Sequence, residues 1–205
     1  GLRGDVERFD RYVEDIEAVL TACCLVSAQR LHLFGHSFGG LLAVFLSRRL
    51  RERWASLTLQ SPLFKLGFTV PKWKEQLGRL AARIAPRLIL SNEVEPRWLS
   101  HDPAVAQRYR QDPLVHRVIS ARAYIALQRA ENDALARAAS LTTPTLMLYG
   151  TDDHVVSSEA CATFFQRLTC EKRVIVFQGA YHELHHEPVV DEVVGQALDW
   201  MQRHA

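Results

Sequence analysis

The first apolar pattern in the chain has the spacing of a helix. Apolar positions from Val6 to Leu20 follow one another at intervals of three and four residues, as on one face of a helix. Asp5 stands just before them, and aspartate is a favoured N-cap residue. We therefore predict an amphipathic helix that begins at Asp5 and ends near Ala22.

Four short apolar runs further along the chain predict buried strands, each ending near a glycine or a proline. They are Leu31 to Phe34, Leu57 to Leu59, Thr145 to Tyr149 and Arg173 to Phe177. Helical patterns separate or follow them at Phe38 to Leu50, Ser158 to Leu168 and Val189 to Gln202. This alternation predicts an α/β fold whose mainly parallel sheet is flanked by helices and joined by right-handed crossovers.

The interval 61–143 breaks the alternation. It holds six of the eight prolines and has the pattern of several helices separated at those prolines. We predict a helical cap inserted between two parts of a core, residues 1–60 and 144–205. The aromatic residues at the start of the interval either line a groove for an acyl chain or bury the cap against the core.

Composition narrows the classes of function. The chain has 205 residues, 48% of them hydrophobic, which is enough for a sizeable core. The formal charge is +2, and positive and negative side chains are interspersed along the sequence. This pattern does not indicate the basic surface with which proteins bind nucleic acid. Four cysteines, two of them adjacent, fit neither a disulfide framework nor metal-ligand spacing, so we expect reduced thiols and a cytoplasmic location. No apolar stretch reaches the roughly 18 residues of a membrane span, and no signal segment opens the chain.

The first predicted strand leads directly into Gly35-His36-Ser37-Phe38-Gly39-Gly40 and then into a helix. A strand, a tight turn and a helix around G-x-S-x-G form the nucleophile elbow of a serine hydrolase. Ser37 is the predicted nucleophile, and the backbone N–H of Phe38 is a predicted oxyanion donor. We expect Gly35 and Gly39 to be required because side chains there would collide with the strand and helix, with Gly40 assisting. The alternative is a glycine-rich turn with an incidental serine.

An activated serine needs a histidine base and a carboxylate, in the chain order Ser, acid, His. The strand that ends at Tyr149 is followed by Asp152 and Asp153, of which Asp153 is the predicted acid while Asp152 caps the turn. The loop before the last helix supplies His182 as the predicted base. The nearby His185 and His186 are expected to decorate the start of that helix or face solvent. No metal and no cofactor are predicted.

Four stretches of the sequence together resemble one group of enzymes: residues 35–41, 150–156 and 179–182, and Asp112-Pro113-Leu114-Val115-His116 in the cap. The group is the monoacylglycerol lipase and lysophospholipase branch of the α/β-hydrolases, also labelled serine aminopeptidase-like. The resemblance implies a mobile helical cap that binds an acyl chain and can touch a membrane surface transiently. It also implies that Ser37 is acylated by a monoacylglycerol or lysophospholipid ester and that water then releases the fatty acid.

The chain departs from that group at its start. Relatives carry several strands and an HG-type loop, the source of a second oxyanion donor, before the position of Gly1. We therefore expect an N-terminally truncated hydrolase that is weak or inactive by itself although its parent is active. A peptidase, a small-molecule esterase or a non-catalytic interaction scaffold remain alternatives, and the oligomeric state is left open.

Overall fold

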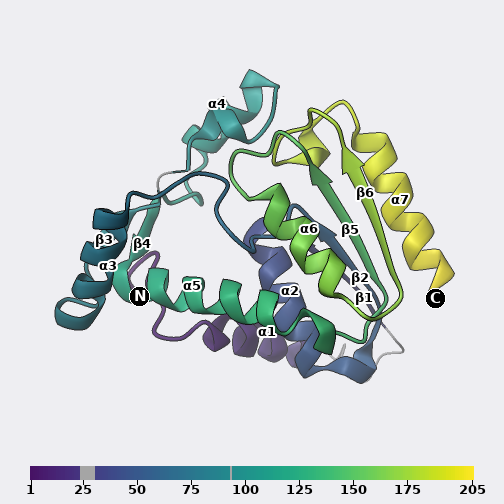
Figure 1. The fold of residues 1–205 in the computed structure, drawn as a ribbon, viewed down its shortest axis with the longest axis horizontal. Helices are drawn as coiled ribbons and strands as arrows, with labels where there is room; N and C mark the ends of the chain where they lie inside the picture. Colours follow the sequence, from purple (N-terminus) through teal and green to yellow (C-terminus); the bar gives the residue numbers. More distant parts are fainter. Residues whose placement is uncertain (24–30, 93) are drawn as a thin grey trace.

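A four-stranded parallel sheet in the order β1-β2-β5-β6 forms the centre of the chain (Figure 1). The computed structural model describes residues 1–23, 31–92 and 94–205. The strands are β1 (Leu31–His36), β2 (Trp54–Gln60), β5 (Thr145–Gly150) and β6 (Lys172–Phe177). All four predicted strands are thereby confirmed. The two inner strands, β2 and β5, are buried along their whole length, which explains why they appear in the sequence as apolar runs.

Helices cover both faces of this sheet. The helices on one face are α1 (Asp10–Ala22), α2 (Ser37–Arg49), α5 (Ala121–Ala136) and α6 (Ser158–Arg167), and α7 (Val190–Arg203) covers the other face (Figure 1). Successive residues of β5 serve the two faces in turn. Met147 belongs to the core under the first group of helices, whereas Leu146 and Leu148 pack with Trp200 of α7. The predicted helical patterns are thus confirmed as the two outer layers.

The predicted start of the first helix is wrong. Helix α1 begins at Asp10, and Asp5 lies in the irregular segment before it. The carboxylate of Asp5 instead accepts two hydrogen bonds from the guanidinium of Arg122, at 2.8 and 2.6 Å. These bonds from Arg122 lower the pKa of Asp5 to about 2, against the effect of burial. A partner 117 residues away along the chain leaves no trace in the local pattern, which is why Asp5 looked like a cap.

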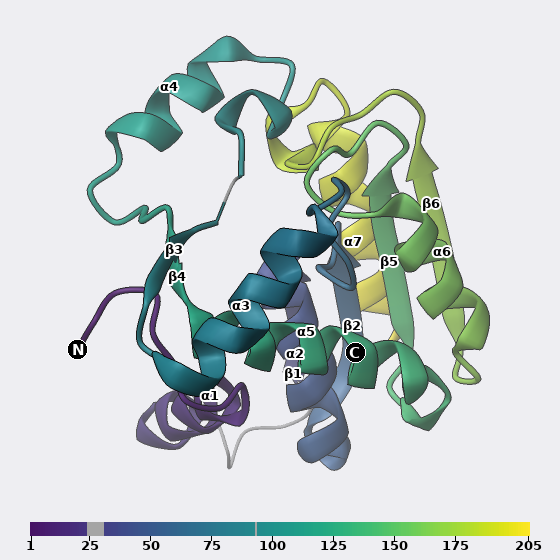
Figure 2. The same cartoon turned by 60° about the vertical axis from the view of Figure 1, so that its left-hand side comes forward.

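The interval 61–143 contains the expected helices and one feature that the sequence did not predict. Helix α3 (Lys72–Ile84) follows Pro71, and α4 (Pro103–Gln111) begins with Pro103 behind the capping side chain of Asp102. The unpredicted feature is an antiparallel pair of short strands, β3 (Ile89–Ser91) and β4 (Val118–Ser120), visible in Figure 2. Strands of three residues are too short for an alternating pattern to reveal them.

Helix α5 belongs to the interval 61–143 and also to the core. Ala130 and Ala134 of α5 are buried in the same cluster as residues of α1, α2 and α6. Nearer its start, Tyr124 of α5 packs close to Gly78 of α3. Helix α5 therefore links the outer helices of the interval to the sheet. The division into residues 1–60, 61–143 and 144–205 stays a prediction.

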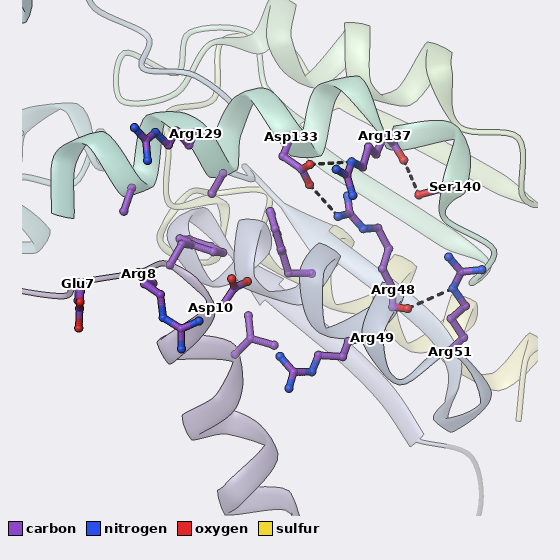
Figure 3. Close-up of a pocket in the computed structure, with 15 residues that line it drawn as sticks. Glu7, Arg8, Asp10, Arg48, Arg49, Arg51, Arg129, Asp133, Arg137 and Ser140 are labelled. Carbon is purple, nitrogen blue, oxygen red and sulfur yellow. Dashed lines mark hydrogen bonds and ion pairs between the residues drawn. The ribbon is translucent and has the colours of Figure 1, made fainter. Parts of the chain in front are cut away.

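A groove of about 770 Å³ lies between the start of α1, the end of α2 and α5 (Figure 3). Within it, the carboxylate of Asp133 on α5 bonds Arg48 of α2 at 2.7 Å and Arg137 at 2.8 Å. The pair with Arg48 holds α2 against α5, whereas the pair with Arg137 lies within α5 and its C-cap. None of Ser37, Asp153 and His182 lines this groove. Among the helices that the structure describes, none is long and apolar enough to cross a membrane.

Candidate active site

Ser37 stands at the junction of β1 and α2, in the strand, turn and helix arrangement that the sequence predicted. Its backbone has a φ of +52°, in the left-handed region that a non-glycine residue adopts only at a cost. The N–H of Leu63, just after β2, donates to the carbonyl oxygen of Ser37 at 3.0 Å. The elbow is thus fixed between two adjacent strand ends, with the Ser37 side chain at the carboxyl edge of the sheet.

The glycines around Ser37 do not all have the role expected of them. A Cβ at Gly35 would lie 2.6 Å from the carbonyl oxygen of Gly39 and 2.8 Å from the Cβ of Ala43. A Cβ at Gly40 would lie 2.9 Å from the side chain of Pro62. A Cβ at Gly39 would meet nothing within 4 Å in this structure. The prediction that a side chain at Gly39 would collide with its neighbours is therefore wrong for the described residues. The close approaches occur at Gly35 and Gly40.

The structure brings the three residues predicted for catalysis into one hydrogen-bonded chain. His182 Nε2 lies 2.9 Å from Ser37 Oγ, and His182 Nδ1 lies 2.8 Å from Asp153 Oδ2. The side chains of His182 and Asp153 are only 3% and 1% exposed. A buried carboxylate that accepts from Nδ1–H leaves Nε2 as the acceptor for the serine proton. These are the contacts expected of a nucleophile, a base and an orienting acid, and the catalytic roles stay a prediction.

Backbone groups fix the Asp153 carboxylate. Its second oxygen, Oδ1, accepts from the N–H groups of Val155 and Val156 at 2.8 and 2.9 Å. Asp152, by contrast, is exposed, and its carboxylate accepts a hydrogen bond from the neighbouring Thr151 hydroxyl. Local turn geometry thus separates the two adjacent aspartates, one turned inward and the other outward.

The loop that carries His182 is attached to its surroundings by backbone contacts. The carbonyl oxygen of Ala180 accepts from the N–H of Asp152 at 3.2 Å, so the base loop and the acid loop are directly connected. A Cβ at Gly150 would run into that same carbonyl group, which makes Gly150 a requirement that the sequence did not reveal. On the other side, the N–H of Glu183 donates to the carbonyl oxygen of Leu99 at 2.8 Å. These contacts set the position of the imidazole.

Two further histidines lie beside His182, in an arrangement that no local sequence pattern predicted. The ring of His36 lies 4.8 Å from that of His182 and 5.0 Å from that of His185. The buried side chain of Gln60, at the end of β2, lies within 3.3 Å of His36 Nδ1 and 2.8 Å of His185 Nδ1. Burial, and then the neighbouring His182 and His185, lower the pKa of His36 to about 3. His36 is therefore neutral at physiological pH, and no cation lies at that position beside the base.

His185 is exposed, as expected from the sequence, but its contact with Gln60 was not predicted.

His101, a histidine with no motif around it, has a structural role. Its Nδ1 lies 2.6 Å from the buried carboxylate of Glu187. Burial favours a raised pKa for Glu187, but hydrogen bonds from the backbone and ring of His101 lower it overall. This pair ties the segment before α4 to the start of the last helix.

Phe38 follows Ser37 as the first residue after the elbow, and its ring packs edge-on against Phe9 and Tyr12 of the α1 region. Its backbone N–H is in the first turn of α2, where N–H groups have no partner within the helix. The role of this N–H as an oxyanion donor stays a prediction.

The comparisons with known proteins decide the family. The model of the family described as serine aminopeptidase, S33 matches residues 1–189. The chain belongs to this family. The structural neighbours of this S33 chain show that its fold is the α/β-hydrolase fold. It superimposes on the crystal structure of a monoacylglycerol lipase of Paleococcus ferrophilus with a TM-score of 0.87 and 28% identity, covering 100% of this chain and 79% of that one.

Curated relatives of this S33 chain are longer than the chain itself. An uncharacterized abhydrolase domain-containing protein of Dictyostelium discoideum is 32% identical over 206 residues, which cover 98% of this chain and 22% of that protein. A putative monoglyceride lipase of Schizosaccharomyces pombe is 29% identical over 182 residues, which cover 85% of this chain and 48% of the relative. The chain thus spans less than half the length of these two relatives.

Proposed function

We propose that this chain carries the catalytic residues of a serine hydrolase that cleaves carboxylic esters of the monoacylglycerol type through an acyl-enzyme intermediate. The observation that carries the proposal is the continuous chain from Ser37 Oγ through His182 to the buried Asp153, with contacts of 2.9 and 2.8 Å. The relatives named as monoglyceride lipases support the choice of substrate class.

The proposal gives each residue a role. His182 Nε2 takes the hydroxyl proton as Ser37 Oγ attacks the ester carbonyl, and Asp153 stabilises the imidazolium that forms. The N–H of Phe38 and the amino end of α2 face the negative charge that develops on the carbonyl oxygen. His182 then gives its proton to the departing alcohol, which leaves Ser37 acylated. A water molecule, deprotonated by the same histidine, attacks the acyl group, and the fatty acid and free Ser37 result.

Helix α3 supports contact of the cap with a lipid surface. Four large apolar side chains at spacings of four, three and four residues form a stripe on this helix, and each is more than half exposed. They are Trp73, Leu77, Leu80 and Ile84. The same helix carries basic side chains at Lys72, Lys74, Arg79 and Arg83. An apolar stripe beside basic residues is typical of a helix that lies in the interface of an anionic membrane, where monoacylglycerols reside.

A substrate panel tests the proposal. The purified chain is offered a long-chain monoacylglycerol, a lysophospholipid, a short acyl ester and an aminoacyl amide, with Ser37→Ala as the control. We expect the monoacylglycerol to be cleaved fastest and the Ser37→Ala chain to release no product above background. Faster cleavage of the amide would favour the peptidase alternative. Product release that survives Ser37→Ala would contradict the proposed nucleophile.

The expectation that the 205-residue chain turns over weakly by itself stays a prediction. Slow turnover with intact monoacylglycerol preference agrees with the proposal. Absence of both turnover and covalent labelling at Ser37 would agree with an inactive truncated hydrolase and with the interaction scaffold, and the same tests on a chain extended upstream separate these two.

A cytoplasmic location also stays a proposal. The structure describes three free cysteines, Cys23, Cys161 and Cys170, while Cys24 lies outside the described residues. Burial raises the pKa of the Cys161 thiol, which makes it unreactive. Free thiols are the expected state in a reducing compartment.

A further inference from the structure

The segment 61–67, which follows β2, lies against the turn that carries the predicted acid. The N–H of Gly67 donates to the carbonyl oxygen of Val155 at 2.9 Å. The N–H of Ser157 donates to the carbonyl oxygen of Lys65, also at 2.9 Å. These two bonds flank a single antiparallel bridge between the segment and the turn. We call residues 153–157 the acid turn.

The bond from Gly67 acts on Asp153 through one peptide group. The carbonyl oxygen of Val155, which accepts from Gly67, belongs to the same peptide group as the N–H of Val156. That N–H donates to Asp153 Oδ1 at 2.9 Å. Because a trans peptide group is planar, its C=O and its N–H point in opposite directions and can only turn together. The bond from Gly67 therefore fixes the direction of an N–H that holds the carboxylate.

This bond requires a glycine at position 67. A Cβ there would lie 2.9 Å from the carbonyl carbon and oxygen of His154 and 2.9 Å from the carbonyl oxygen of Val156. All three are backbone atoms of the acid turn, so rotation of a side chain cannot make room for it. A residue with a Cβ must push the segment and the turn apart, and this movement lengthens the bond from Gly67 to Val155.

The segment has a fixed position from which Gly67 acts on the turn. Phe64 is 1% exposed and stacks on Phe164 of α6, with ring centroids 4.0 Å apart. The N–H of Ser61 donates to the carbonyl oxygen of Leu148 in β5 at 2.8 Å. The core and the sheet thus hold the segment on the side away from Gly67.

We propose that Gly67 is a positioning residue for the acid. Its hydrogen bond to Val155 holds the Asp153 carboxylate in the direction that His182 requires. The effect on hydrolysis rests on the proposed function, whereas the hydrogen bond between Asp153 and His182 can be observed without any substrate. Gly67 acts through Asp153, so its replacement should lower the rate of the chemical step and leave substrate binding unchanged.

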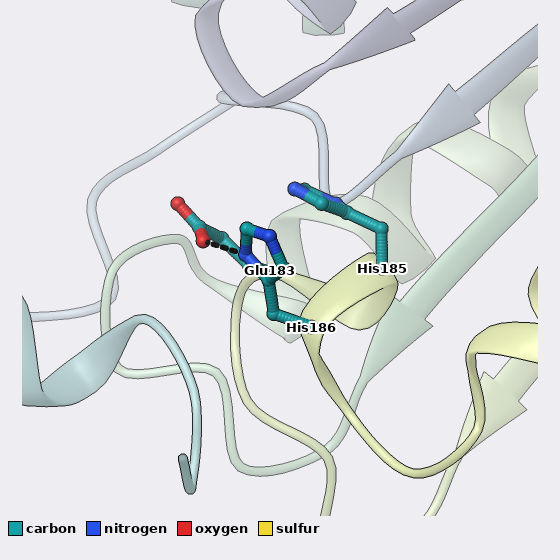
Figure 4. A group of neighbouring side chains, drawn as sticks. All are labelled: Glu183, His185 and His186. Atoms are coloured by element: carbon teal, nitrogen blue, oxygen red, sulfur yellow. Dashed lines mark hydrogen bonds and ion pairs between the residues drawn. The ribbon is translucent and has the colours of Figure 1, made fainter. Parts of the chain in front are cut away.

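The proton between His182 Nδ1 and Asp153 is observed by NMR in the full 205-residue chain with isotope-labelled histidine. Such a proton resonates far downfield because the hydrogen bond is short and the acceptor is charged. The Nδ1 atoms of His101 and His186 each lie 2.6 Å from a glutamate carboxylate and give similar signals. Figure 4 shows the bond between His186 and Glu183. The signal that disappears in His182→Ala is the one to follow.

Glycine-to-alanine variants separate positioning from loss of stability. In Gly67→Ala we expect the signal of His182 to move upfield or to broaden beyond detection. Gly195→Ala on α7 places its Cβ in open space and should keep the parent signal. Gly4→Ala is the matched control, because Gly4 has a φ of +73° and a Cβ there would collide with the carbonyl group of Val118 in β4. It should lose stability and still keep the parent signal.

Amide hydrogen exchange in the parent chain adds a test that needs no variant, in case Gly67→Ala does not fold. The N–H groups of Gly67 and Val156 should exchange slowly and at similar free energies of opening, because one peptide group joins their bonds. Rapid exchange at Gly67 beside a protected Val156 would overturn the proposal.

Hydrolysis of a long-chain monoacylglycerol then measures the consequence for the reaction. Per folded chain, kcat of Gly67→Ala should fall by up to about 10²-fold with KM unchanged, the loss expected when a catalytic group is misplaced by about 1 Å. Gly4→Ala and Gly195→Ala should keep the parent kcat. An unchanged signal of His182 or an unchanged kcat in folded Gly67→Ala would overturn the proposal. A chain that cleaves no ester in any form would contradict the proposed function, and the NMR signal would still decide the role of Gly67.

Discussion

Asp153 holds His182 with one carboxylate oxygen and is itself held by the other. Oδ2 lies 2.8 Å from His182 Nδ1, and Oδ1 accepts from the backbone of Val155 and Val156. The carboxylate therefore cannot rotate without losing three hydrogen bonds. This relationship fixes both the tautomer and the direction of the imidazole before any substrate arrives.

Replacement of this carboxylate tests that role. In Asp153→Asn the amide can present its N–H₂ to His182 Nδ1, which favours the tautomer with the proton on Nε2 and removes the acceptor for the serine proton. We expect kcat for ester hydrolysis to fall about 10⁴-fold. The control is Asp152→Asn, since Asp152 is exposed and its carboxylate bonds only the neighbouring Thr151 among the described contacts. Comparable losses in the two variants would contradict the assignment of the acid.

The three glycines of the elbow should respond differently to alanine. Gly35→Ala and Gly40→Ala place a Cβ within 3 Å of backbone or of Pro62, so each should destabilise the chain by about 1–3 kcal/mol, the usual cost of overpacking. Gly39→Ala meets open space and should change stability by less than about 1 kcal/mol. Denaturant unfolding of the three variants measures this order. A Gly39→Ala chain as unstable as the other two would show that the backbone conformation, not space, requires a glycine there.

The apolar stripe of α3 should govern attachment to lipid. Replacing both Leu77 and Ile84 by glutamate removes two exposed apolar side chains and adds negative charge, so binding to phosphatidylserine-containing vesicles should weaken at least about tenfold. Leu198→Glu is a control of similar exposure, on α7. Sedimentation with vesicles measures the bound fraction. If Leu198→Glu weakened binding as much as the double variant, α3 would not be the contact surface.

Glu131 on α5 should make stability depend on pH. Burial raises the pKa of this carboxyl group from its usual 4.5 to about 7. Between these values the folded chain holds a proton that the unfolded chain has lost, so the contribution of Glu131 to stability falls as pH rises from about 4.5 to 7 and is constant above that. Glu131→Gln should therefore be the more stable chain at pH 8, by up to about 3 kcal/mol.

Thermal unfolding of Glu131→Gln and the parent chain at pH 5 and pH 8 measures this difference. Glu52→Gln is the matched control, because Glu52 is exposed. A gain in Glu131→Gln that is no larger at pH 8 than at pH 5 would rule out a partly buried, protonated carboxyl group at this position.

Much of the sheet and of the site could be predicted because their signals are local. The inner strands are buried on both faces, so they form continuous apolar runs, and Ser37, Asp153 and His182 each follow a strand at a recognisable turn. The order Ser, acid, His along the chain then follows from the fold. The local sequence around Gly35 also predicted that a side chain there would collide with its neighbours, and the structure shows this close approach.

The remaining features depend on contacts that are distant in sequence. Asp5 looked like a helix cap because nothing near it indicates Arg122, and Gly39 looked essential because its neighbours in space could not be known. Gln60 joins His36 and His185, which lies 125 residues further along the chain, and no local pattern indicates that bridge. The short strands β3 and β4 pair only because the chain between them folds back.

Covalent labelling of Ser37 is the most direct test of the central claim, that Ser37, His182 and Asp153 form a working nucleophile. The folded chain is incubated with a fluorophosphonate, and the modified peptide is identified by mass spectrometry. Labelling should occur at Ser37, be absent in Ser37→Ala and slow by at least about 10²-fold in His182→Ala, because the hydroxyl reacts only when a base takes its proton. A folded chain that is not labelled at Ser37, or that is labelled equally fast without His182, would contradict the account.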